Sequence, residues 1–459
     1  MRGALFVSAA ALVTLACAMP LTGCGMLVGV DWDRVAVTDA GIQYLPDGAV
    51  APPGYDGGTS SSSGSSGSSS GTSGSSGSSS GTSGSSGSSS GDAGPITCTP
   101  PQIRCVVGCC TDDLDPGLPA GVTGGQSNTC AVTTTGKVRC WGVNTVGELG
   151  RGNGKDSLVP VTAYGIPKGA TQAVIGSAHG CAVVNDVIGC WGANGSGQLG
   201  FDGAPGSLGV EEPGRVQKLQ GAIASIAVGS NFSCAVVAGT AYCWGDNEYG
   251  QLATDPTTYR SSVPLTIAQI GSGVIAVGAG GTEACAGIAG GSVSCWGGQG
   301  ANPPTKVTGV TGATSIGVGS LHKCALAGGT VYCWGDNLYA ELGNNSADGV
   351  TPTAPTGLPT TVTQLAVGGM HSCALAGGQV WCWGNNTYGE LGRDPISVSR
   401  GLPTVVPGIS GVTAIAAGDN HTCAILPNNG LKCWGGNGVG QLGNGTKDSG
   451  PTPVDVTWP

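Results

Sequence analysis

The sequence predicts an all-β protein, a seven-bladed β-propeller with four-stranded blades. A motif of two cysteines separated by eight or nine residues, the second followed by Trp-Gly, occurs seven times. The second cysteines recur at steps of 50, 53, 52, 38, 49 and 51 residues, a period typical of stacked supersecondary units. Glycine occupies 88 of 459 positions and no segment shows a convincing 3.6-residue apolar period, which disfavours helical repeats.

Each copy of the motif predicts four short strands. The segment before the first cysteine is apolar or β-branched, as in AIASIAVG (222–229) and VTQLAVG (362–368). The two segments that carry the cysteines are separated by turn residues such as TTTG and PNNG, and a segment rich in Pro and Val follows, such as LVPVTAY (158–164). Each copy therefore predicts an antiparallel blade, and a closed ring leaves only short strand edges exposed.

Two small residues hold fixed places beside the first cysteine of every copy. A glycine lies five positions before that cysteine, and an alanine lies one position after it. The glycines are Gly125, Gly176, Gly229, Gly280, Gly319, Gly368 and Gly418, and the alanines are Ala131, Ala182, Ala235, Ala286, Ala325, Ala374 and Ala424. Because a larger side chain would clash in a sharp bend or a crowded contact, we expect these residues to lie at such places.

A longer motif follows the second cysteine in six copies. Cys-Trp-Gly-x-Asn-x-x-Gly-(Gln/Glu)-Leu-Gly is matched nearly completely at 140–150, 190–200, 243–253, 333–343, 382–392 and 433–443. Together with Gly-x4-Cys-Ala, it resembles the repeat of the regulator of chromosome condensation family over residues 120–459, and that resemblance implies a seven-bladed β-propeller. The fourth copy, CWGGQGANPPTKVTG (295–309), lacks the Asn and the Leu-Gly. We expect its outer loop to be truncated and its blade to be thinner.

The histidines raise the question of a metal site. All four, His179, His322, His371 and His421, lie two positions before the first cysteine of a repeat, where the other copies have Asn128, Phe232 and Glu283. Zinc needs ligands that converge on one point, whereas these lie in different blades. We interpret them as structural residues, hydrogen-bonded near a blade junction, and expect no metal and no cofactor. The repeated tryptophans, which we interpret as blade packing, are Trp141, Trp191, Trp244, Trp296, Trp334, Trp383 and Trp434.

The N-terminus predicts export and lipidation. Residues 1–23 have the form of a signal peptide, and LTGC (21–24) has the form of a bacterial lipobox, which implies cleavage before Cys24 and attachment of a lipid to its sulfur. An ordinary signal peptide or a short membrane anchor is the alternative. Outside the cytoplasm disulfides persist, and the remaining cysteines form an even set of 18.

We therefore expect one disulfide in each hairpin, because cysteines opposite one another on neighbouring antiparallel strands have suitable separations. Each should contribute about 2–3 kcal/mol to stability. A small two-disulfide knot is expected for Cys98, Cys105, Cys109 and Cys110, although in a reducing cell this cluster could bind zinc or iron–sulfur. The expected hairpin pairs are Cys130/Cys140, Cys181/Cys190, Cys234/Cys243, Cys285/Cys295, Cys324/Cys333, Cys373/Cys382 and Cys423/Cys433.

The segments before the propeller are low in complexity. Residues 24–58 form a polar segment, residues 59–91 are almost wholly Ser and Gly, and residues 92–119 contain the cysteine cluster. A Ser/Gly tract cannot bury a core, so it predicts a disordered tether with an r.m.s. span of about 30 Å. We expect one propeller domain, residues 120–459, tethered in the cell envelope; inner and outer membrane are not distinguished.

The expected function is binding without catalysis. No P-loop, HExxH or GxSxG motif is present, and a net charge of −10 with a pI near 4.7 opposes nucleic-acid binding and leaves the N-terminal lipid as the membrane contact. In the family that the repeats resemble, one eukaryotic member promotes nucleotide exchange on a nuclear GTPase, a role that export and acidity disfavour here, and a secreted bacterial member inhibits β-lactamases. We expect a monomeric scaffold for a protein or a surface glycan.

The alternative is a lyase or hydrolase of envelope polymers with a site at one channel mouth. Clustered Asp, Glu and Arg there would favour it, whereas a lining of Gly, Ala and Ser would favour binding. The ligand and the binding face stay open. The loops that vary most in length and charge are the expected binding surface, at 151–158, 201–213, 254–262, 344–353 and 393–401.

The last expectation concerns ring closure. The segment PTPVDVT (451–457) follows the final cysteine pair with no repeat after it, and DLDPGLPAGVTGG (113–125) provides only a poor counterpart of such a strand ahead of the first pair. If each Pro-and-Val segment serves the next copy, residues 451–457 cross the seam and join the blade of Cys130 and Cys140.

Overall fold

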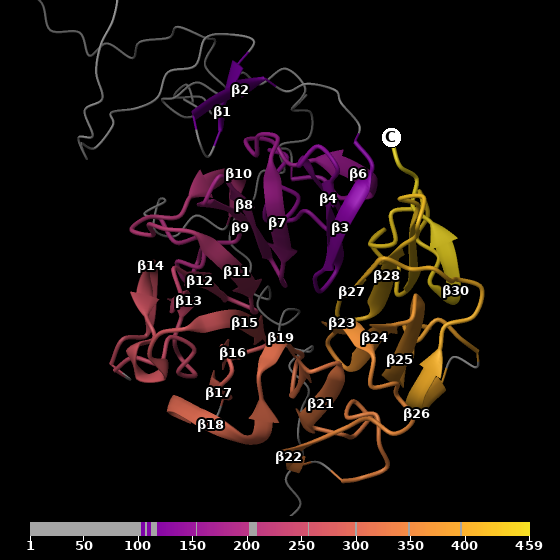
Figure 1. Ribbon diagram of the computed structural model, residues 1–459. Helices are drawn as coiled ribbons and strands as arrows, with labels where there is room; N and C mark the ends of the chain where they lie inside the picture. Colours follow the sequence, from indigo (N-terminus) through magenta and orange to yellow (C-terminus); the bar gives the residue numbers. More distant parts are fainter. Residues whose placement is uncertain are drawn as a thin grey trace, which may run out of the picture. The chain divides into compact units, whose positions relative to one another are not determined.

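The computed structural model describes residues 102–105, 108–111, 117–152, 154–201, 209–255, 257–298, 301–347, 349–394 and 397–459. Seven four-stranded antiparallel sheets follow one another around a ring (Figure 1). The first strand of each sheet lies innermost and contacts the first strands of both neighbouring sheets, and β27 contacts β3 to close the circle. The predicted seven-bladed propeller is therefore confirmed.

Every blade consists of four strands that are consecutive in the sequence. Blade 1 contains β3 (Pro119–Gly124), β4 (Asn128–Thr133), β5 (Val138–Gly142) and β6 (Ser157–Thr162). Blade 2 contains β7 (Ala170–Ile175), β8 (His179–Val184), β9 (Val187–Gly192) and β10 (Val210–Arg215). Blade 3 contains β11 (Ile223–Val228), β12 (Phe232–Val237), β13 (Thr240–Asp246) and β14 (Arg260–Thr266), followed by the short 3-10 helix η3 (Ala268–Ile270).

The remaining blades have the same order. Blade 4 contains β15 (Val274–Gly280), β16 (Glu283–Ile288), β17 (Ser292–Gly297) and β18 (Ala301–Thr311). Blade 5 contains β19 (Ala313–Val318), β20 (His322–Ala327), β21 (Thr330–Gly335) and β22 (Gly349–Thr353). Blade 6 contains β23 (Val362–Val367), β24 (His371–Ala376), β25 (Gln379–Asn386) and β26 (Ser397–Val405). Blade 7 contains β27 (Ala414–Ala417), β28 (His421–Ile425), β29 (Leu431–Gly435) and β30 (Gly450–Asp455).

A separate two-stranded hairpin precedes the ring. It pairs β1 (Gln102–Cys105) with β2 (Gly108–Thr111), with Ile103 opposite Cys110 and Arg104 opposite Cys109. The pairing predicted for the cysteines of this segment, the signal peptide, Cys24 and the Ser/Gly tether lie outside the described residues and side chains. Within the described part of the chain, no helix is long and apolar enough to span a membrane.

The hydrophobic cores lie between blades. One cluster joins Leu149 and Val138 of blade 1 to Ala182 and Trp191 of blade 2, all with no exposed surface. A blade therefore buries its apolar faces against both neighbours, and the alanine after each first cysteine is fully buried in this contact. The small size of this residue follows from the close approach of adjacent sheets.

The repeated glycines lie where neighbouring backbones meet around the channel. A Cβ atom at Gly176 would lie 2.7 Å from the carbonyl oxygen of Gly229, and one at Gly368 would lie 2.3 Å from that of Gly418. Backbone bonds cross between blades at the same level, for example from the amide of Gln126 to the oxygen of Gly176 at 3.3 Å. The predicted crowded contact is the contact between adjacent blades.

Blade 4 differs from its neighbours in the way that the fourth motif copy predicts, with one exception. The connection from β17 to β18 spans only residues 298–300, whereas the corresponding connection in blade 1 spans residues 143–156. The loop is shortened, but the blade is not thinner, because it keeps four strands.

The expectation for the seam between the last and first blades is wrong. β30 pairs with β29 of its own blade, where Val454 lies opposite Cys433, and blade 1 has its own outer strand, β6, with Val161 opposite Cys140. Each Pro-and-Val segment therefore belongs to the cysteine pair that precedes it. The segment ahead of the first pair supplies the inner strand β3, so no strand is missing from blade 1.

Side chains close the seam instead of an exchanged strand. The indole N–H of Trp458 donates to the carbonyl oxygen of Gly117 at 2.7 Å. Its ring lies edge-on to Trp141, with centroids 6.4 Å apart, and under the guanidinium of Arg139 at 5.7 Å. Two residues after Gly117, the carbonyl oxygen of Pro119 accepts the side-chain amide of Asn429 at 2.8 Å. These contacts join blades 7 and 1 without a shared strand.

Candidate functional site

The propeller has two faces that differ in the length of their loops. On one face lie the bends between first and second strands, such as 125–127, and the long connections between third and fourth strands, such as 143–156. We call it the loop face. The opposite face, which we call the turn face, carries the short turns between the two cysteine strands, such as Thr134–Lys137, and the links between blades.

The channel opens on the loop face into a cavity of about 230 Å³. It is lined by the seven repeated glycines and by the residue that follows each of them, namely Gln126, Ser177, Ser230, Gly281, Ser320, Gly369 and Asp419. Asp419 is the only charged residue among the described residues that line it, and burial raises the pKa of its carboxyl group. Toward the turn face the lining is apolar, with residues such as Ile226, Ile316 and Leu365. Among the described lining residues, the mouth therefore holds one acidic side chain and no cluster of Asp, Glu and Arg.

The asparagine of the tail motif shapes the loop that follows each third strand. In blade 1, Oδ1 of Asn144 accepts the backbone N–H of Leu149 at 2.9 Å, and that leucine is fully buried. The corresponding pairs are Asn194/Leu199, Asn247/Leu252, Asn337/Leu342, Asn386/Leu391 and Asn437/Leu442. The motif therefore specifies a loop that returns its leucine to the core.

The glutamine or glutamate before that leucine joins its loop to the next blade. Between blades 1 and 2, the carbonyl oxygen of Glu148 accepts the indole N–H of Trp191 at 2.7 Å, while its carboxylate accepts the amide of Val146 at 2.8 Å. The other tryptophan–acceptor pairs are Trp244/Gln198, Trp296/Gln251, Trp383/Glu341, Trp434/Glu390 and Trp141/Gln441. The tryptophans thus connect adjacent blades, which confirms that they are packing residues.

The histidines add further hydrogen bonds to these contacts between adjacent blades, which we call joints. Between blades 7 and 1, Nε2 of His421 lies 2.7 Å from Oγ1 of Thr129, and this hydroxyl donates to the carbonyl oxygen of Gln441 at 2.8 Å. Because a hydroxyl has one hydrogen, the Thr129 oxygen must accept from the ring, which assigns the neutral Nε2–H tautomer to His421. The equivalent contacts are His179 to Ser233 at 2.8 Å, His322 to Ser372 at 2.9 Å and His371 to Thr422 at 2.9 Å. The predicted structural role of the histidines is confirmed.

Burial keeps these rings neutral. It lowers the pKa of His179 and His421 from 6.5 to about 4, and that of His322 and His371 to about 3. Repulsion from the charge of Lys323 lowers the pKa of His322 further, and repulsion from His421 and His322 in their protonated forms lowers the pKa of His371 further. No group of metal-ligating side chains occurs in the described part of the chain.

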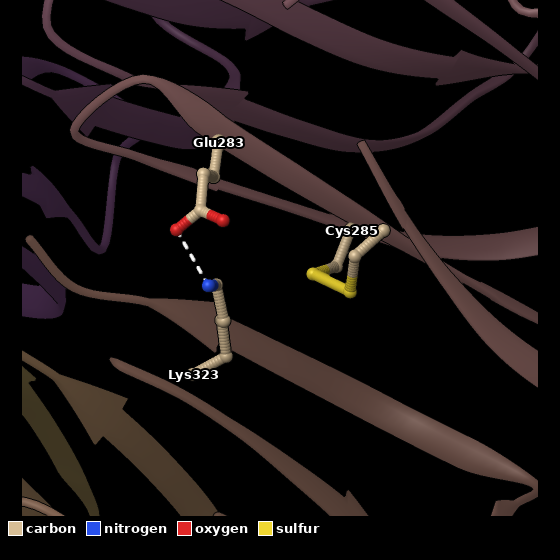
Figure 2. Close-up of polar contacts among 4 residues, drawn as sticks. Glu283, Cys285 and Lys323 are labelled. Carbon is tan, nitrogen blue, oxygen red and sulfur yellow. Dashed lines mark ion pairs between the residues drawn. A yellow bond between two sulfur atoms is a disulfide. The ribbon is translucent and has the colours of Figure 1, made fainter. Parts of the chain in front are cut away.

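The joint between blades 4 and 5 is built differently. Blade 4 lacks the tail motif, so it has no glutamine or glutamate at the position whose carbonyl oxygen accepts an indole N–H in the other six blades. Glu283 occupies the histidine position and Lys323 the hydroxyl position, and their charged groups lie 2.5 Å apart (Figure 2). Their side chains are only 23% and 12% exposed. An ion pair therefore replaces the histidine–hydroxyl bond at the joint that has lost its loop.

The seven hairpin cysteine pairs form disulfides in the structure. Each links the second and third strands of one blade between directly opposite residues, with Cα atoms 4.0 Å apart in Cys130–Cys140 and 4.2 Å apart in Cys373–Cys382. The others are Cys181–Cys190, Cys234–Cys243, Cys285–Cys295, Cys324–Cys333 and Cys423–Cys433. Each disulfide is local to its blade, so it constrains the hairpin and does not connect blades.

The described parts of the loops expected to bind a ligand lie on the loop face, between the third and fourth strands of blades 1, 2, 3, 5 and 6. Residues 153, 202–208, 256, 348 and 395–396 of these loops are outside the described set. Sequence reasoning missed the apolar side chains exposed on the same face, among them Tyr259, Leu321 and Val350. Leu321 lies in the bend between β19 and β20. When the seven copies of the motif are compared, its position is variable, and nothing in the sequence marks it as exposed.

Comparison with known families agrees with this architecture. A model of the regulator of chromosome condensation (RCC1) repeat matches residues 190–236, 238–286, 328–375 and 377–425, and a second model of that repeat matches 120–148, 223–251, 362–390 and 412–441. The chain belongs to the RCC1 repeat family. The matches of the first model run through the tail of one blade into the cysteine strands of the next, so the RCC1 repeat includes a joint between blades.

Several curated proteins with RCC1-like sequences are similar to parts of this chain. The human E3 ubiquitin-protein ligase HERC2 is 30% identical over 252 residues, which is 50% of this chain and 5% of HERC2. The ultraviolet-B receptor UVR8 of Arabidopsis thaliana is 33% identical over 32% of this chain and 34% of the receptor. The secretion-regulating guanine nucleotide exchange factor of Bos taurus is 29% identical over 71% of this chain and 80% of that protein.

A solved structure shows the same fold. The structure of Prp20p from Saccharomyces cerevisiae, a protein with binding properties to Gsp1p and histones, superposes with a TM-score of 0.61. The match covers 72% of this chain and 86% of that one, at 20% sequence identity. At this identity the similarity establishes the RCC1 fold alone.

The buried histidines predict an acid-labile fold. The unfolded chain binds protons at its histidines below pH 6.5, whereas the folded chain binds them only near pH 4 or below. Stability is therefore complete above pH 6.5 and falls as the pH is lowered toward 4, by about 1.4 kcal/mol per pH unit for each histidine. The carboxyl groups of Asp419 and Glu390 act in the opposite direction, because burial raises their pKa values and the folded chain then binds their protons more readily than the unfolded chain. They are two groups against four histidines, so the loss of stability at low pH should prevail. Denaturant unfolding at pH 7.5, 5.5 and 4.5 measures how the free energy of unfolding changes with pH. In the His371→Gln variant one fewer histidine takes up a proton on unfolding, so this change should be smaller by about 1.4 kcal/mol per pH unit.

The ion pair at the joint between blades 4 and 5 predicts a compensating exchange. Glu283→His or Lys323→Ser alone leaves a charge in a largely buried site and should lower the free energy of unfolding by about 1–2 kcal/mol. Both changes together recreate the His–Ser pair of two other joints, His179–Ser233 and His322–Ser372, and should restore the free energy of unfolding to within about 1 kcal/mol of the parent. A double variant that loses the sum of the two single effects would contradict this. Urea unfolding of the four proteins completes the cycle.

Proposed function

We propose that this RCC1 propeller is a binding scaffold in the cell envelope, anchored by a lipid on Cys24, which holds a protein or a surface glycan against its loop face without catalysing a reaction. The observation that carries the proposal is the contrast between a uniform framework and a variable face. Six tail motifs repeat the same hydrogen bonds, whereas the loops that extend from them differ in length and charge. Such a division is typical of scaffolds that display a recognition surface.

The channel supports binding rather than hydrolysis or lyase chemistry. Its loop-face mouth is lined mainly by glycine and serine with Gln126, and Asp419 is the one charged side chain among the described lining residues. Acid–base cleavage of a polymer needs two positioned titratable groups, and this mouth supplies one. The four buried histidines have low pKa values and are engaged in the joints between blades, so they are unsuited to proton transfer at neutral pH.

Anchoring rests on the sequence before the ring. The lipobox LTGC at 21–24 and the Ser/Gly tract at 59–91 are in the order that a tethered lipoprotein requires. The seven disulfides are consistent with an oxidising compartment. The net charge of −10 disfavours direct attachment to anionic lipid.

Anchoring is tested by the conversion of Cys24 to alanine. In a bacterial host, the parent chain should incorporate radiolabelled palmitate and sediment with membranes, whereas Cys24→Ala should incorporate none. Cys17→Ala, which changes a cysteine within the signal peptide, is the matched control and should behave as the parent. Palmitate incorporation into the Cys24→Ala chain, or its absence from the parent chain, would exclude lipidation at this site.

Binding is tested with the purified, oxidised full chain. Immobilised chain is exposed to solubilised envelope proteins and to a glycan array, and retained molecules are compared with those of two variants. Tyr259→Asp with Val350→Asp alters the loop face, where these side chains are 73% and 91% exposed, and should weaken retention at least tenfold. Leu118→Asp, which alters the turn face, should leave retention unchanged. Retention of nothing, or cleavage of an array polymer by the parent chain, would refute the proposed function.

A further inference from the structure

Exposed apolar side chains gather on one part of the loop face. Among the described residues, nine large apolar side chains are exposed, and seven of them lie on the loop face. Five belong to blades 5 and 6, and we call them the apolar arc. They are Leu321, Leu338, Val350, Met370 and Tyr388.

Hydrogen bonds place these five side chains in neighbouring loops. The amide of Ser320 donates to the oxygen of Gly369 at 3.0 Å, so the residues that follow, Leu321 and Met370, lie in adjoining bends. The carbonyl oxygen of Leu321 accepts the amide of Asp336 at 3.1 Å, which brings it beside the loop that carries Leu338.

Two further contacts complete the arc. The amide of Asn385 donates to the oxygen of Met370 at 2.9 Å, three residues before Tyr388. Gly335 lies opposite Gly349, which places Val350 at the loop-face end of the outer strand of blade 5. The arc is therefore one surface across two adjacent blades, while the described parts of blades 1, 2 and 7 expose no large apolar side chain on this face.

The charges around the arc are predominantly acidic. Asp336 and Asp394 lie on the same loops, Asp394 is exposed, and Asp419 faces the channel mouth beside Gly369. The basic side chains that the structure describes in blades 5 and 6, Lys323 and Arg393, are engaged within the propeller. The ammonium of Lys323 is paired with Glu283, and the guanidinium of Arg393 donates to the oxygen of Leu402 at 3.4 Å and is half-buried. A partner on this surface meets negative charge beside apolar side chains.

We infer that the apolar arc binds a cationic protein segment that carries apolar side chains between lysines or arginines. Four of the five arc residues are aliphatic, and they offer bulk and adaptable packing rather than the flat rings on which sugars stack. Methionine and tyrosine are enriched in protein interfaces, and the surrounding carboxylates complement lysine or arginine. The inference rests on the proposed binding function and assigns to it a surface and a partner chemistry.

Three fluorescent peptides of equal length test the inference in titrations with the full chain. One alternates lysine with leucine and tryptophan, the second has glutamate in place of lysine, and the third has serine in place of the apolar residues. The first should bind at least tenfold more tightly than either of the others. Leu338→Ser with Met370→Ser and Tyr388→Ser should reduce its binding at least tenfold.

A matched control uses the same loop position in other blades. Val146 and Val439 correspond to Tyr388 in blades 1 and 7, and Val146→Ser with Val439→Ser should leave binding unchanged. Thermal unfolding checks that both variants are folded. Equal binding of the glutamate peptide or the serine peptide, or full binding by the arc variant, would overturn the inference. If, in the capture experiment with envelope proteins and glycans, the triple serine variant of the apolar arc retains the same molecule as the parent chain, the binding surface is wrongly assigned, while the proposed scaffold function stands.

Discussion

The carbonyl oxygen of the tail glutamine or glutamate connects one blade to the next. It accepts an indole N–H from the following blade in six joints, and in three of them also a hydroxyl that is itself bonded to a histidine. The carbonyl, indole, hydroxyl and imidazole groups that take part in these hydrogen bonds are buried, so each would carry a desolvation cost if its partner were absent. The spacing of Trp, Asn, Gln or Glu and Leu within a repeat is set by this contact, because the loop must reach across the boundary and return its leucine to the core.

Much of this architecture could be predicted from the sequence because the constraints repeat. Seven copies fix the number of blades, and the interval between cysteines places them opposite each other on one hairpin. The histidines could be recognised as structural because they share one position in the repeat. Their partners could not be identified, because Ser233, Thr422 and Thr129 belong to the next blade and the pairing appears only when the ring is closed.

Two features lay beyond the sequence for physical reasons. A four-stranded meander and a ring with an exchanged outer strand have the same order of segments, so the Pro-and-Val segments could be assigned to either neighbour; only the register, such as Val454 opposite Cys433, distinguishes them. Exposure is the second feature. Leu321 or Met370 is buried or exposed according to how the loops around it fold over its side chain. A comparison of the seven copies gives the number of residues in each loop but not its path.

Because every blade is a contiguous stretch of chain, its strand pairing and its disulfide can form before the rest of the ring exists. A polypeptide that folds as it is synthesised can therefore acquire its blades in order, each with short-range contacts that are entropically inexpensive to close. A tandem duplication or deletion of about fifty codons would likewise add or remove a complete blade and leave its neighbours whole. A ring fastened by an exchanged strand would lose both properties, since its first blade would stay unfinished until the last segment arrived.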